Sequence, residues 1–307
     1  MQLKDALAQG IELLEKARVA SPRLTAEVLL MHAARCDRAH LHAHPERELS
    51  DSEWVHYGRY LNERLQGKPT QYITGRQEFW GMEFHVNPSV LIPRPETEHV
   101  VEAALALARA HFPPGSDCRI ADVGTGSGCI AVALASELPH AAIYALEQSP
   151  EALETARQNA RRLGVGNRIS FLQSDLLEID SGEALPQLEI VACNPPYVAE
   201  RDQSKVQAEV RNFEPHAAVF AGESGQEAYR KLIPQAARAL RLGGYLALEL
   251  GYDAEERVRN LLPPSEWDEV RSLPDLAGIV RVVTARCASV AASESEPRPL
   301  RQAQGRL

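Results

Sequence analysis

The chain of 307 residues has few cysteines and no long apolar run, and both absences restrict its class. Its five cysteines lie far apart and never form a C-x-x-C pair, which argues against a disulfide framework or a zinc site. No stretch of roughly 18 apolar residues occurs, so we expect no transmembrane helix. The N-terminus lacks the basic start and apolar core of a signal peptide. These absences predict a cytoplasmic protein without a bound metal and without membrane contact.

Positive charge is also scarce. The chain carries 33 Lys and Arg against 42 Asp and Glu, which gives a formal net charge of −9. Proteins that coat nucleic acid normally carry an excess of basic residues, so we expect no stable nucleic-acid binding.

The 44% hydrophobic and 24% charged residues are values of a folded globular protein and exclude wholesale disorder. At about 100–200 residues per domain, the length predicts one large domain or two.

Residues 1–70 are predicted to form a small helical N-terminal domain. Apolar residues recur at helical spacing near the start, and Ser50 with Glu53 fits a capping box. Residues 71–97 then contain two short strand-like segments around a glycine turn, which predicts a β-hairpin and linker. In the stiff, proline-containing stretch that follows, Thr97 is expected to cap the next helix.

Residues 98–287 alternate between short apolar runs and helical segments. This alternation predicts an α/β domain with a mostly parallel sheet covered by helices on both faces. The expected strands are 119–123, 142–146, 169–173, 189–193 and 245–250, with a final hairpin over 267–273 and 280–285. The last stretch, 288–307, is rich in Ser, Glu, Pro, Arg and Gln, and we expect it to be disordered.

A glycine-rich loop follows the first predicted strand of this domain and precedes a helix. Glycine lets the backbone turn sharply and lets a ligand approach closely, and this edge of an α/β sheet is where ligands bind. The spacing is G-x-G-x-G, and the G-K-[ST] sequence of a phosphate-binding P-loop is absent. The loop reads Asp122, Val123, Gly124, Thr125, Gly126, Ser127 and Gly128.

Acidic residues at the ends of the next two strands favour an adenosyl cofactor. Glu147 lies about 20 residues after the loop, where a carboxylate can accept both ribose hydroxyls. Asp175 and Leu176 follow the third strand and are predicted to lie near the adenine edge. Asp122 supplies negative charge, which suits the ammonium and sulfonium of S-adenosylmethionine better than a pyrophosphate. We therefore predict S-adenosylmethionine rather than a nicotinamide dinucleotide.

The tetrapeptide Asn194-Pro195-Pro196-Tyr197 follows the fourth strand. A planar nitrogen attacks poorly because its lone pair is delocalised, and two acceptors aimed at its N–H bonds would bind and orient it. The Asn194 side-chain oxygen and the Pro195 carbonyl are candidates for these acceptors, and Asn194 is also a candidate contact to the cofactor. Tyr197 offers a flat face for the substrate. The pattern predicts methyl transfer to an amide or amine nitrogen.

Five segments together resemble the protein-(glutamine-N5) methyltransferases, and in particular the release factor glutamine methyltransferases of the PrmC/HemK type. These segments are Gln71–Gly75, Glu78–Gly81, Ile92–Glu98, Asp122–Gly128 and Asn194–Tyr197. The likeness runs from about residue 1 to 287. It implies a helical N-terminal domain, a β-hairpin linker and a class I S-adenosylmethionine-dependent methyltransferase domain, Rossmann-like with a mostly parallel seven-stranded sheet.

The resemblance also implies a substrate, the glutamine of the Gly-Gly-Gln motif in class I peptide chain release factors. It assigns cofactor binding to Gly124–Gly128 and Glu147, and amide binding to Asn194–Tyr197. Glu147 and Leu176 depart from the Asp and the bulky aromatic residue common in the family. Three alternatives stay open: methylation of ribosomal protein L3, adenine-N6 methylation of nucleic acid, and a non-catalytic binding module. We expect a monomer.

Overall fold

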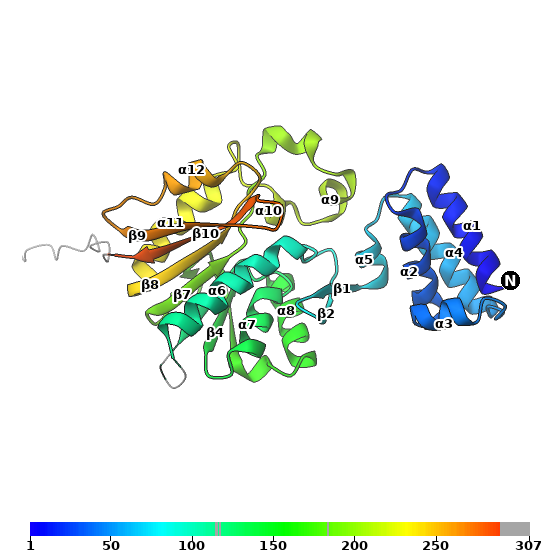
Figure 1. The fold of residues 1–307 in the computed structure, drawn as a ribbon, viewed down its shortest axis with the longest axis horizontal. Helices are drawn as coiled ribbons and strands as arrows, with labels where there is room; N and C mark the ends of the chain where they lie inside the picture. The colour runs from blue at the N-terminus through cyan, green and yellow to red at the C-terminus, as the bar shows by residue number, and fades with distance from the viewer. Residues whose placement is uncertain (114–115, 117, 183, 289–307) are drawn as a thin grey trace, which may run out of the picture.

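The computed structural model describes residues 1–113, 116, 118–182 and 184–288, and it places a helical domain beside a larger α/β domain (Figure 1). The tail predicted to be disordered lies, from residue 289 on, outside the described residues. Within the described part, each helix is too short or too polar to cross a lipid bilayer. The N-terminal helices are α1 (Leu3–Lys16), α2 (Pro22–Ala34), α3 (Arg38–Ala43), α4 (Asp51–Leu65) and α5 (Thr70–Thr74).

The N-terminal helices enclose an apolar core of their own. Leu3 and Leu14 of α1 pack with Leu29 of α2, all without exposure to solvent. Tyr57 of α4 reaches this core because α1 carries Gly10, where an added Cβ would lie 1.9 Å from the Tyr57 hydroxyl. The predicted capping box at the start of α4 is confirmed, with both hydrogen bonds between Ser50 and Glu53 present. The domain is therefore a packed unit rather than a set of appended helices.

A two-stranded hairpin connects this domain to the rest of the chain. Strand β1 (Arg76–Phe79) pairs antiparallel with β2 (Met82–His85), and the short helix η1 (Pro95–Thr97) then leads into α6 (Glu98–His111). The buried side chain of Asn159 fixes the hairpin to the α/β domain. It accepts from the His85 backbone N–H at 2.7 Å, and it donates to the carbonyls of His85 and Ser127, each at 2.9 Å.

The α/β domain is built on an eight-stranded sheet with the order β6-β5-β4-β3-β7-β8-β10-β9. The five strands from β5 to β8 are parallel, whereas β10 is antiparallel to β8. The predicted seven strands are all present, and the eighth, β6, is a two-residue edge strand. The strands are β3 (Arg119–Val123), β4 (Ala142–Glu147), β5 (Ile169–Asp175), β6 (Glu178–Ile179), β7 (Leu188–Cys193), β8 (Leu240–Glu249), β9 (Trp267–Pro274) and β10 (Val280–Cys287).

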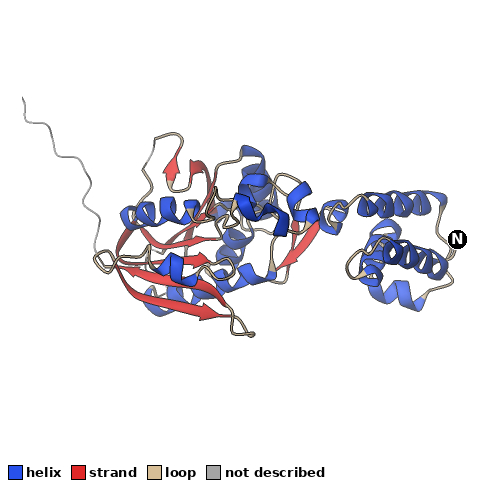
Figure 2. Cartoon of the chain, turned by 90° about the horizontal axis from the view of Figure 1, so that it is seen from above, coloured by secondary structure: helices blue, strands red, loops and turns tan. Residues whose placement is uncertain are grey.

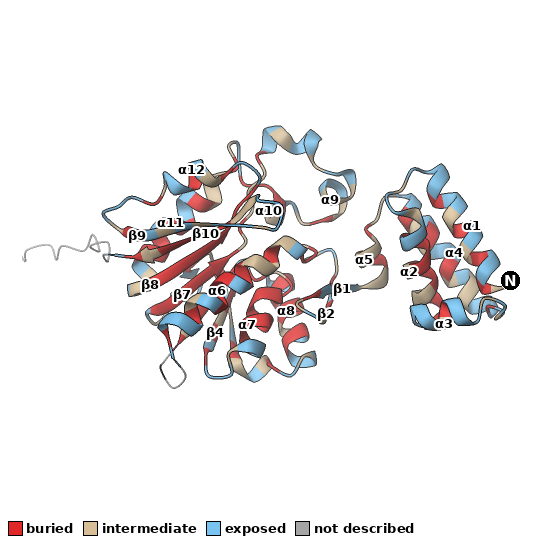
Figure 3. Cartoon of the chain, in the orientation of Figure 1, coloured by how far each residue is buried: buried red, intermediate tan, exposed pale blue. Residues whose placement is uncertain are grey.

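Helices cover both faces of this sheet, as Figure 2 shows from above. Successive residues of one strand point to opposite faces, so Ile120 belongs to the core under α6 and α7 while Ala121 belongs to the core under α11. The buried strands form a continuous layer in Figure 3. The helices around them are α7 (Cys129–Glu137), α8 (Pro150–Arg162), η2 (Gly166–Arg168), η3 (Glu200–Lys205), α9 (Ala208–Phe213), α10 (His216–Val219), α11 (Glu227–Ala239) and α12 (Glu255–Arg259).

Strand β3 is the first of the domain and lies between β4 and β7. The chain leaves β3 toward β4 on one side and later returns to β7 on the other, so the strand order reverses here. Ligands of open α/β sheets bind at the carboxyl ends of the strands at such a point. The glycine loop and the Asn194 tetrapeptide follow β3 and β7, so the topology brings these two motifs together.

Candidate active site

The glycine loop has the left-handed backbone that its sequence predicts. Gly124, Gly126 and Gly128 have φ angles of +70°, +53° and +83°. The loop is held to the end of β4, because Gly124 and Thr125 both donate their N–H groups to the Leu146 carbonyl, at 2.8 and 2.9 Å. A Cβ added at Gly124 would meet no atom within 4 Å. The loop therefore borders open space at Gly124, at the edge of the sheet where a ligand is expected.

Asp122 is fully buried beneath this loop. Its Oδ2 accepts from the Thr125 hydroxyl at 2.6 Å and from the Ala131 N–H at 3.0 Å, which ties the loop to the first turn of α7. Its Oδ1 is buried without a hydrogen-bond partner. Burial raises the pKa of Asp122 from 3.8 to about 7, and the nearby Glu147 carboxylate adds to this shift. The site thus holds an acid that a cationic ligand would stabilise in its charged form.

Glu147 lies at the end of β4, half-buried and fixed in orientation. Its Oε2 accepts from the Gly126 N–H and its Oε1 accepts from the Ser149 N–H, both at 3.0 Å. A carboxylate has roughly four acceptor sites, so these two bonds leave lone pairs for further donors. This geometry is compatible with the prediction that Glu147 accepts two ribose hydroxyls. The glutamate side chain is one methylene longer than the aspartate common in the family, and its carboxylate still faces the loop.

Asp175 ends β5, the strand beside β4, and Leu176 follows it. Asp175 forms an ion pair with Lys231 of α11, which engages one of its oxygens. Leu176 has a positive φ of 57° and packs against the core under α11. Both residues lie at the predicted edge of the sheet, but Asp175 already has a partner. If Asp175 also contacted adenine, its carboxylate would have to bind the adenine and the Lys231 ammonium at the same time.

The tetrapeptide directly follows β7, next to the glycine loop. Asn194 donates its Nδ2–H to the Thr97 hydroxyl at 2.9 Å, which leaves Oδ1 at the other end of the amide without this partner. Pro195 is buried, and Tyr197 is partly buried against the core under α11. A Cβ at Gly251 would lie 2.7 Å from the Tyr197 ring, so this glycine allows the ring to lie on the backbone after β8.

The prediction that Thr97 caps helix α6 is wrong. Thr97 has helical φ and ψ angles and makes no side-chain capping bond, and its hydroxyl instead receives the Asn194 amide. The capping pattern concerns local spacing, whereas the observed partner is 97 residues away in the chain. Thr97 is 3% exposed, so its hydroxyl is placed by the fold of the whole domain.

Glu249 is a second residue that the sequence reasoning missed. It ends β8, is 2% exposed, and its Oε1 accepts from the Tyr197 hydroxyl at 3.5 Å. Burial raises the pKa of Glu249 from 4.5 to about 7, although the hydroxyls of Thr97 and Tyr197 lower it. Burial likewise raises the pKa of Tyr197, with a further contribution from the Glu249 carboxylate. An acid is therefore buried directly behind the tetrapeptide.

The proline-containing segment before α6 is anchored on both sides of Thr97 in the sequence. Arg94 forms an ion pair with Glu214, whose other oxygen accepts from the Ile92 N–H at 3.1 Å. Trp80 of the hairpin donates its backbone N–H to Glu98 at 2.7 Å. These contacts hold the segment that carries Thr97 against the end of the sheet, which explains why its sequence combines prolines with charged residues.

The residues at this edge fit S-adenosylmethionine. The buried Oδ1 of Asp122 has no hydrogen-bond partner, so its negative charge would favour a cationic ligand above the loop, and the position of Gly124 leaves space open there. The fixed carboxylate of Glu147 can accept hydroxyl groups at the far side of the same loop. A large cavity among the described residues lies elsewhere, so cavity volume alone would not have identified this edge.

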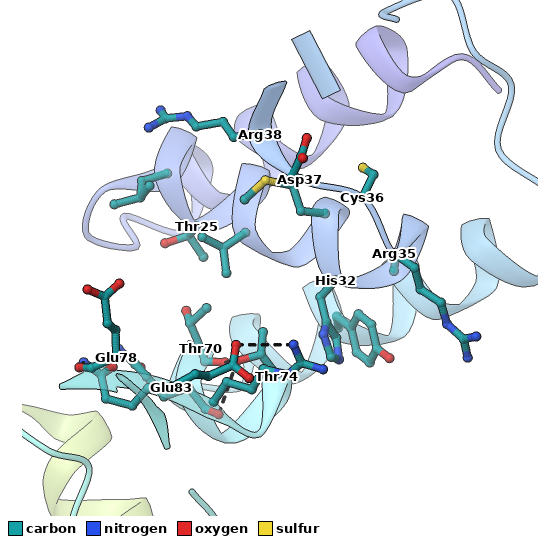
Figure 4. Close-up of a pocket in the computed structure, with 18 of the residues that line it drawn as sticks. Thr25, His32, Arg35, Cys36, Asp37, Arg38, Thr70, Thr74, Glu78 and Glu83 are labelled. Carbon is teal, nitrogen blue, oxygen red and sulfur yellow. Dashed lines mark hydrogen bonds and ion pairs between the residues drawn. The ribbon is translucent and has the colours of Figure 1, made fainter. Parts of the chain in front are cut away.

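That cavity, about 1620 Å³, lies between the N-terminal helices and the hairpin. Figure 4 shows Thr25 and His32 of α2 on one side and Thr70 and Thr74 of α5 on the other. Burial and the neighbouring charges of Arg76, Arg35 and Arg59 lower the pKa of His32. We call this cavity the interdomain cleft, and its lining also carries three arginines and three acidic residues, which are Arg35, Arg38, Arg76, Asp37, Glu78 and Glu83.

The two buried acids predict a specific pH dependence of stability. A carboxyl whose pKa is higher in the folded than in the unfolded chain binds more protons when folded, so the free energy of unfolding falls as pH rises from about 4 to about 7. We expect Asp122→Asn to raise the Tm of the ligand-free protein at pH 8 and to leave it nearly unchanged at pH 4. Each pKa unit corresponds to about 1.4 kcal/mol, so the gain at pH 8 is on the order of a few kcal/mol.

Thermal unfolding measured by circular dichroism across this pH range tests the expectation. The exposed Glu223→Gln provides a charge-matched control, for which Tm is expected to equal that of the parent protein at either pH. An Asp122→Asn variant that is less stable than the parent protein at pH 8 would contradict the account of a buried, destabilising carboxylate.

Known proteins resemble this chain over nearly its whole length. A family profile described as the PrmC N-terminal domain matches residues 5–75, and one described as a methyltransferase domain matches residues 114–271. The release factor glutamine methyltransferase of Koribacter versatilis is 46% identical over 93% of this chain and 99% of its own length. The proteins of the same name from Nitratidesulfovibrio vulgaris and Escherichia coli are 39% and 37% identical, over 92% and 93% of this chain and 95% and 99% of their own lengths.

A solved structure also shares the arrangement of the α/β domain. The hMettl16 catalytic domain, in complex with the MAT2A 3′UTR hairpin 6, superposes with a TM-score of 0.51 and 17% sequence identity. The match covers 78% of this chain and 82% of that one. At this level of identity the likeness concerns the fold alone, which is that of a class I methyltransferase.

Proposed function

This chain belongs to the release factor glutamine methyltransferase family, and from this premise we propose that it methylates the glutamine of the Gly-Gly-Gln motif in class I peptide chain release factors. The methyl group of S-adenosylmethionine is transferred to N5, the side-chain amide nitrogen. The observation that carries the proposal is the position of the Asn194 amide, fixed by Thr97 at the end of β7, beside the glycine loop at the end of β3.

The cofactor would be held by residues from three strand ends. The backbone of Gly124, Thr125, Gly126, Ser127 and Gly128 approaches it closely, and Glu147 accepts its ribose hydroxyls. Asp122 faces its positive charge, Asp175 and Leu176 border the adenine, and Asn194 lies between the cofactor and the substrate. When bound, S-adenosylmethionine supplies a methyl group on a positively charged sulfur, which is a strong electrophile that needs no metal.

The substrate amide would be gripped by two oxygens. Asn194 Oδ1 and the Pro195 carbonyl each accept one N–H of the glutamine side chain, which orients the nitrogen and favours pyramidal geometry as the new bond forms. Pro195 restricts the backbone of Asn194 to an extended conformation, and Pro196 continues the rigid segment. Tyr197 provides a flat surface for the amide. The nitrogen gives up one proton to water after the transfer.

The release factor would dock on the N-terminal domain, residues 1–70, together with the hairpin and linker of residues 71–97. The interdomain cleft offers a concave surface there, large enough to receive protein side chains. The domain of residues 98–287 then receives only the tip of the Gly-Gly-Gln loop. We propose that the enzyme acts in the cytoplasm as a monomer, modifying a protein that terminates translation.

Two other substrates fit the same chemistry less well. Ribosomal protein L3 also presents a glutamine, but the segment Ile92–Glu98 is the feature that favours a release factor. Adenine-N6 methylation poses the same problem of a planar nitrogen, but base flipping relies on phosphate contacts, which a net charge of −9 disfavours. A non-catalytic binding module would not require the fixed amide of Asn194.

The proposed function is tested by incubating the protein with labelled S-adenosylmethionine and three substrates in parallel. These substrates are a purified release factor, the same factor with Gln→Ala in its Gly-Gly-Gln motif, and ribosomal protein L3. We expect label on the first alone, and mass spectrometry of its peptides should place a single methyl group on the glutamine. Label that persists on the Gln→Ala factor, or preferential labelling of L3, would refute the assignment.

A further inference from the structure

We propose that Thr97 and Glu249 are positioning residues, which hold the Asn194 amide in the one orientation that presents its oxygen to the substrate. The inference rests on the proposed function, because it concerns how that same site is preorganised. Neither residue belongs to the glycine loop or to the tetrapeptide, and they reach the site from η1 and from the end of β8.

The need for such residues follows from the shape of a carboxamide. The oxygen and the NH₂ group of Asn194 have nearly the same size, so steric packing alone does not distinguish the two orientations. One orientation offers an acceptor to the substrate N–H, and the other offers a donor that repels it. The bond from Asn194 Nδ2 to the Thr97 hydroxyl, at 2.9 Å, corresponds to the first orientation, and it requires that this hydroxyl accept rather than donate.

Glu249 sets the direction of the Thr97 hydroxyl. A hydroxyl has one hydrogen to donate and lone pairs to accept with, and the carboxylate of Glu249 can only accept. The Glu249 Oε2 atom is buried without a hydrogen-bond partner, and the Thr97 hydroxyl lies near enough to lower the pKa of this carboxyl. The Thr97 hydrogen therefore points toward this unpartnered acceptor, and its lone pairs point toward Asn194. Thr97 and Glu249 are 3% and 2% exposed, so water does not substitute for either partner.

The same carboxylate also reaches the other end of the tetrapeptide. Its Oε1 accepts from the Tyr197 hydroxyl at 3.5 Å, and the ring of Tyr197 rests on the backbone at Gly251. One acid thus contacts, directly or through Thr97, both side chains that flank the two prolines. An uncharged glutamine at position 249 would offer a donor in place of one acceptor and would no longer impose this direction.

Protonation of Glu249 would have a similar effect, so the orientation of Asn194 is expected to depend on pH. A neutral carboxyl can donate to Thr97, which frees the Thr97 hydrogen to point at Asn194 and favours the reversed amide. The charged and titratable groups around Glu249 are Glu96 of η1, Arg281 of β10, Tyr197, Tyr229 of α11, Cys193 of β7 and Cys129 of α7.

The experiment compares Thr97→Val, which keeps the shape and removes the hydroxyl, with Thr97→Ser, which keeps the hydroxyl. A matched control is Thr155→Val in α8, because the buried Thr155 hydroxyl also accepts from an asparagine, Asn87, at 3.0 Å, outside the site. For each variant, kcat and KM for the release factor, the Kd for S-adenosylmethionine and the Tm are measured.

We expect Thr97→Val to lower kcat by about 10–100-fold, with the Kd for S-adenosylmethionine within about twofold of the parent value. Thr97→Ser should recover kcat to within about threefold, and Thr155→Val should lose a similar amount of Tm while retaining kcat. In Glu249→Gln, kcat should lie below the parent value above about pH 7 and approach it at lower pH, so the rise of kcat with pH expected near 7 in the parent protein should be absent.

Three outcomes would overturn the proposal: a parental kcat in Thr97→Val, a Thr97→Ser variant as slow as Thr97→Val, or a Thr155→Val variant equally slow. Failure of the proposed function is recognised separately. In that case the parent protein itself would leave the release factor unmodified, whereas failure of this inference leaves the parent active and the Thr97 and Glu249 variants unaffected.

Discussion

Replacing Asn194 by alanine is expected to lower kcat by on the order of 100- to 1000-fold while the Kd for S-adenosylmethionine changes by less than about fivefold. The side-chain oxygen is one of the two acceptors proposed for the substrate amide, and its loss leaves the nitrogen held by a single backbone carbonyl. The glycine loop keeps its own hydrogen bonds to Leu146 and Asp122, so the cofactor surface remains in place.

Single-turnover methylation of a release factor and calorimetric titration with S-adenosylmethionine separate the two effects. The exposed Asn167→Ala in η2 is the matched control, with parental values expected for both quantities. If Asn194→Ala turned over at the parental rate, the amide-binding role of this residue would be excluded. If it lost cofactor affinity in proportion to kcat, Asn194 would be a cofactor residue rather than a substrate residue.

Gly124→Ala is expected to weaken binding of S-adenosylmethionine by about 100-fold or more. The residue has a φ of +70°, which strains any side chain, and its added methyl group would enter the open space where the cofactor is expected. Binding energy is then lost both through the displaced loop and through direct overlap with the ligand. Calorimetric titration with S-adenosylmethionine measures the loss, and kcat at saturating cofactor should fall less than the affinity.

Gly164→Ala separates backbone strain from overlap with the ligand. Gly164 has a φ of +78° and, like Gly124, no atom within 4 Å of an added Cβ, but it lies after α8 and away from the loop. Both variants should have a similarly lower Tm than the parent protein. The corresponding loss in the free energy of unfolding is on the order of 1 kcal/mol. Equal cofactor affinity in the two variants would show that Gly124 does not border the cofactor.

Local patterns in the sequence were sufficient for much of the fold. The apolar run 119–123 coincides with β3, and the final hairpin over 267–273 and 280–285 appears as β9 and β10, extended by one and two residues. Such segments are recognisable because a buried parallel strand is apolar on both faces and ends at turn residues. The capping box at Ser50 was recognisable for a similar reason, because its partners are three residues apart.

Contacts between distant residues could not be obtained in this way. Asn159 reads as an ordinary polar residue on a helix, yet it is fully buried and binds His85, 74 residues earlier. Thr97 stands at a sequence position that is typical of a helix cap, but its hydroxyl binds the Asn194 amide and makes no capping bond. Glu249 ends an apolar strand without any local sign that its carboxylate is buried behind a tetrapeptide 52 residues earlier.

These residues share a physical property that a single sequence does not display. Each is a polar side chain that is costly to bury alone and becomes acceptable only when its partners arrive from other elements. The raised pKa values of Asp122 and Glu249 show that the acids remain destabilising in their charged forms. Stability is thus reduced at the site where the proposed chemistry requires fixed acceptors and negative charge.

The most direct test of this account is a crystal structure of the protein with S-adenosylhomocysteine and a release factor fragment that contains the Gly-Gly-Gln motif. We predict that the glutamine amide nitrogen lies about 3 Å from both Asn194 Oδ1 and the Pro195 carbonyl oxygen, facing the sulfur above the glycine loop. Density that places the glutamine away from these two oxygens, or that shows Asn194 with its NH₂ group toward the substrate, would contradict it.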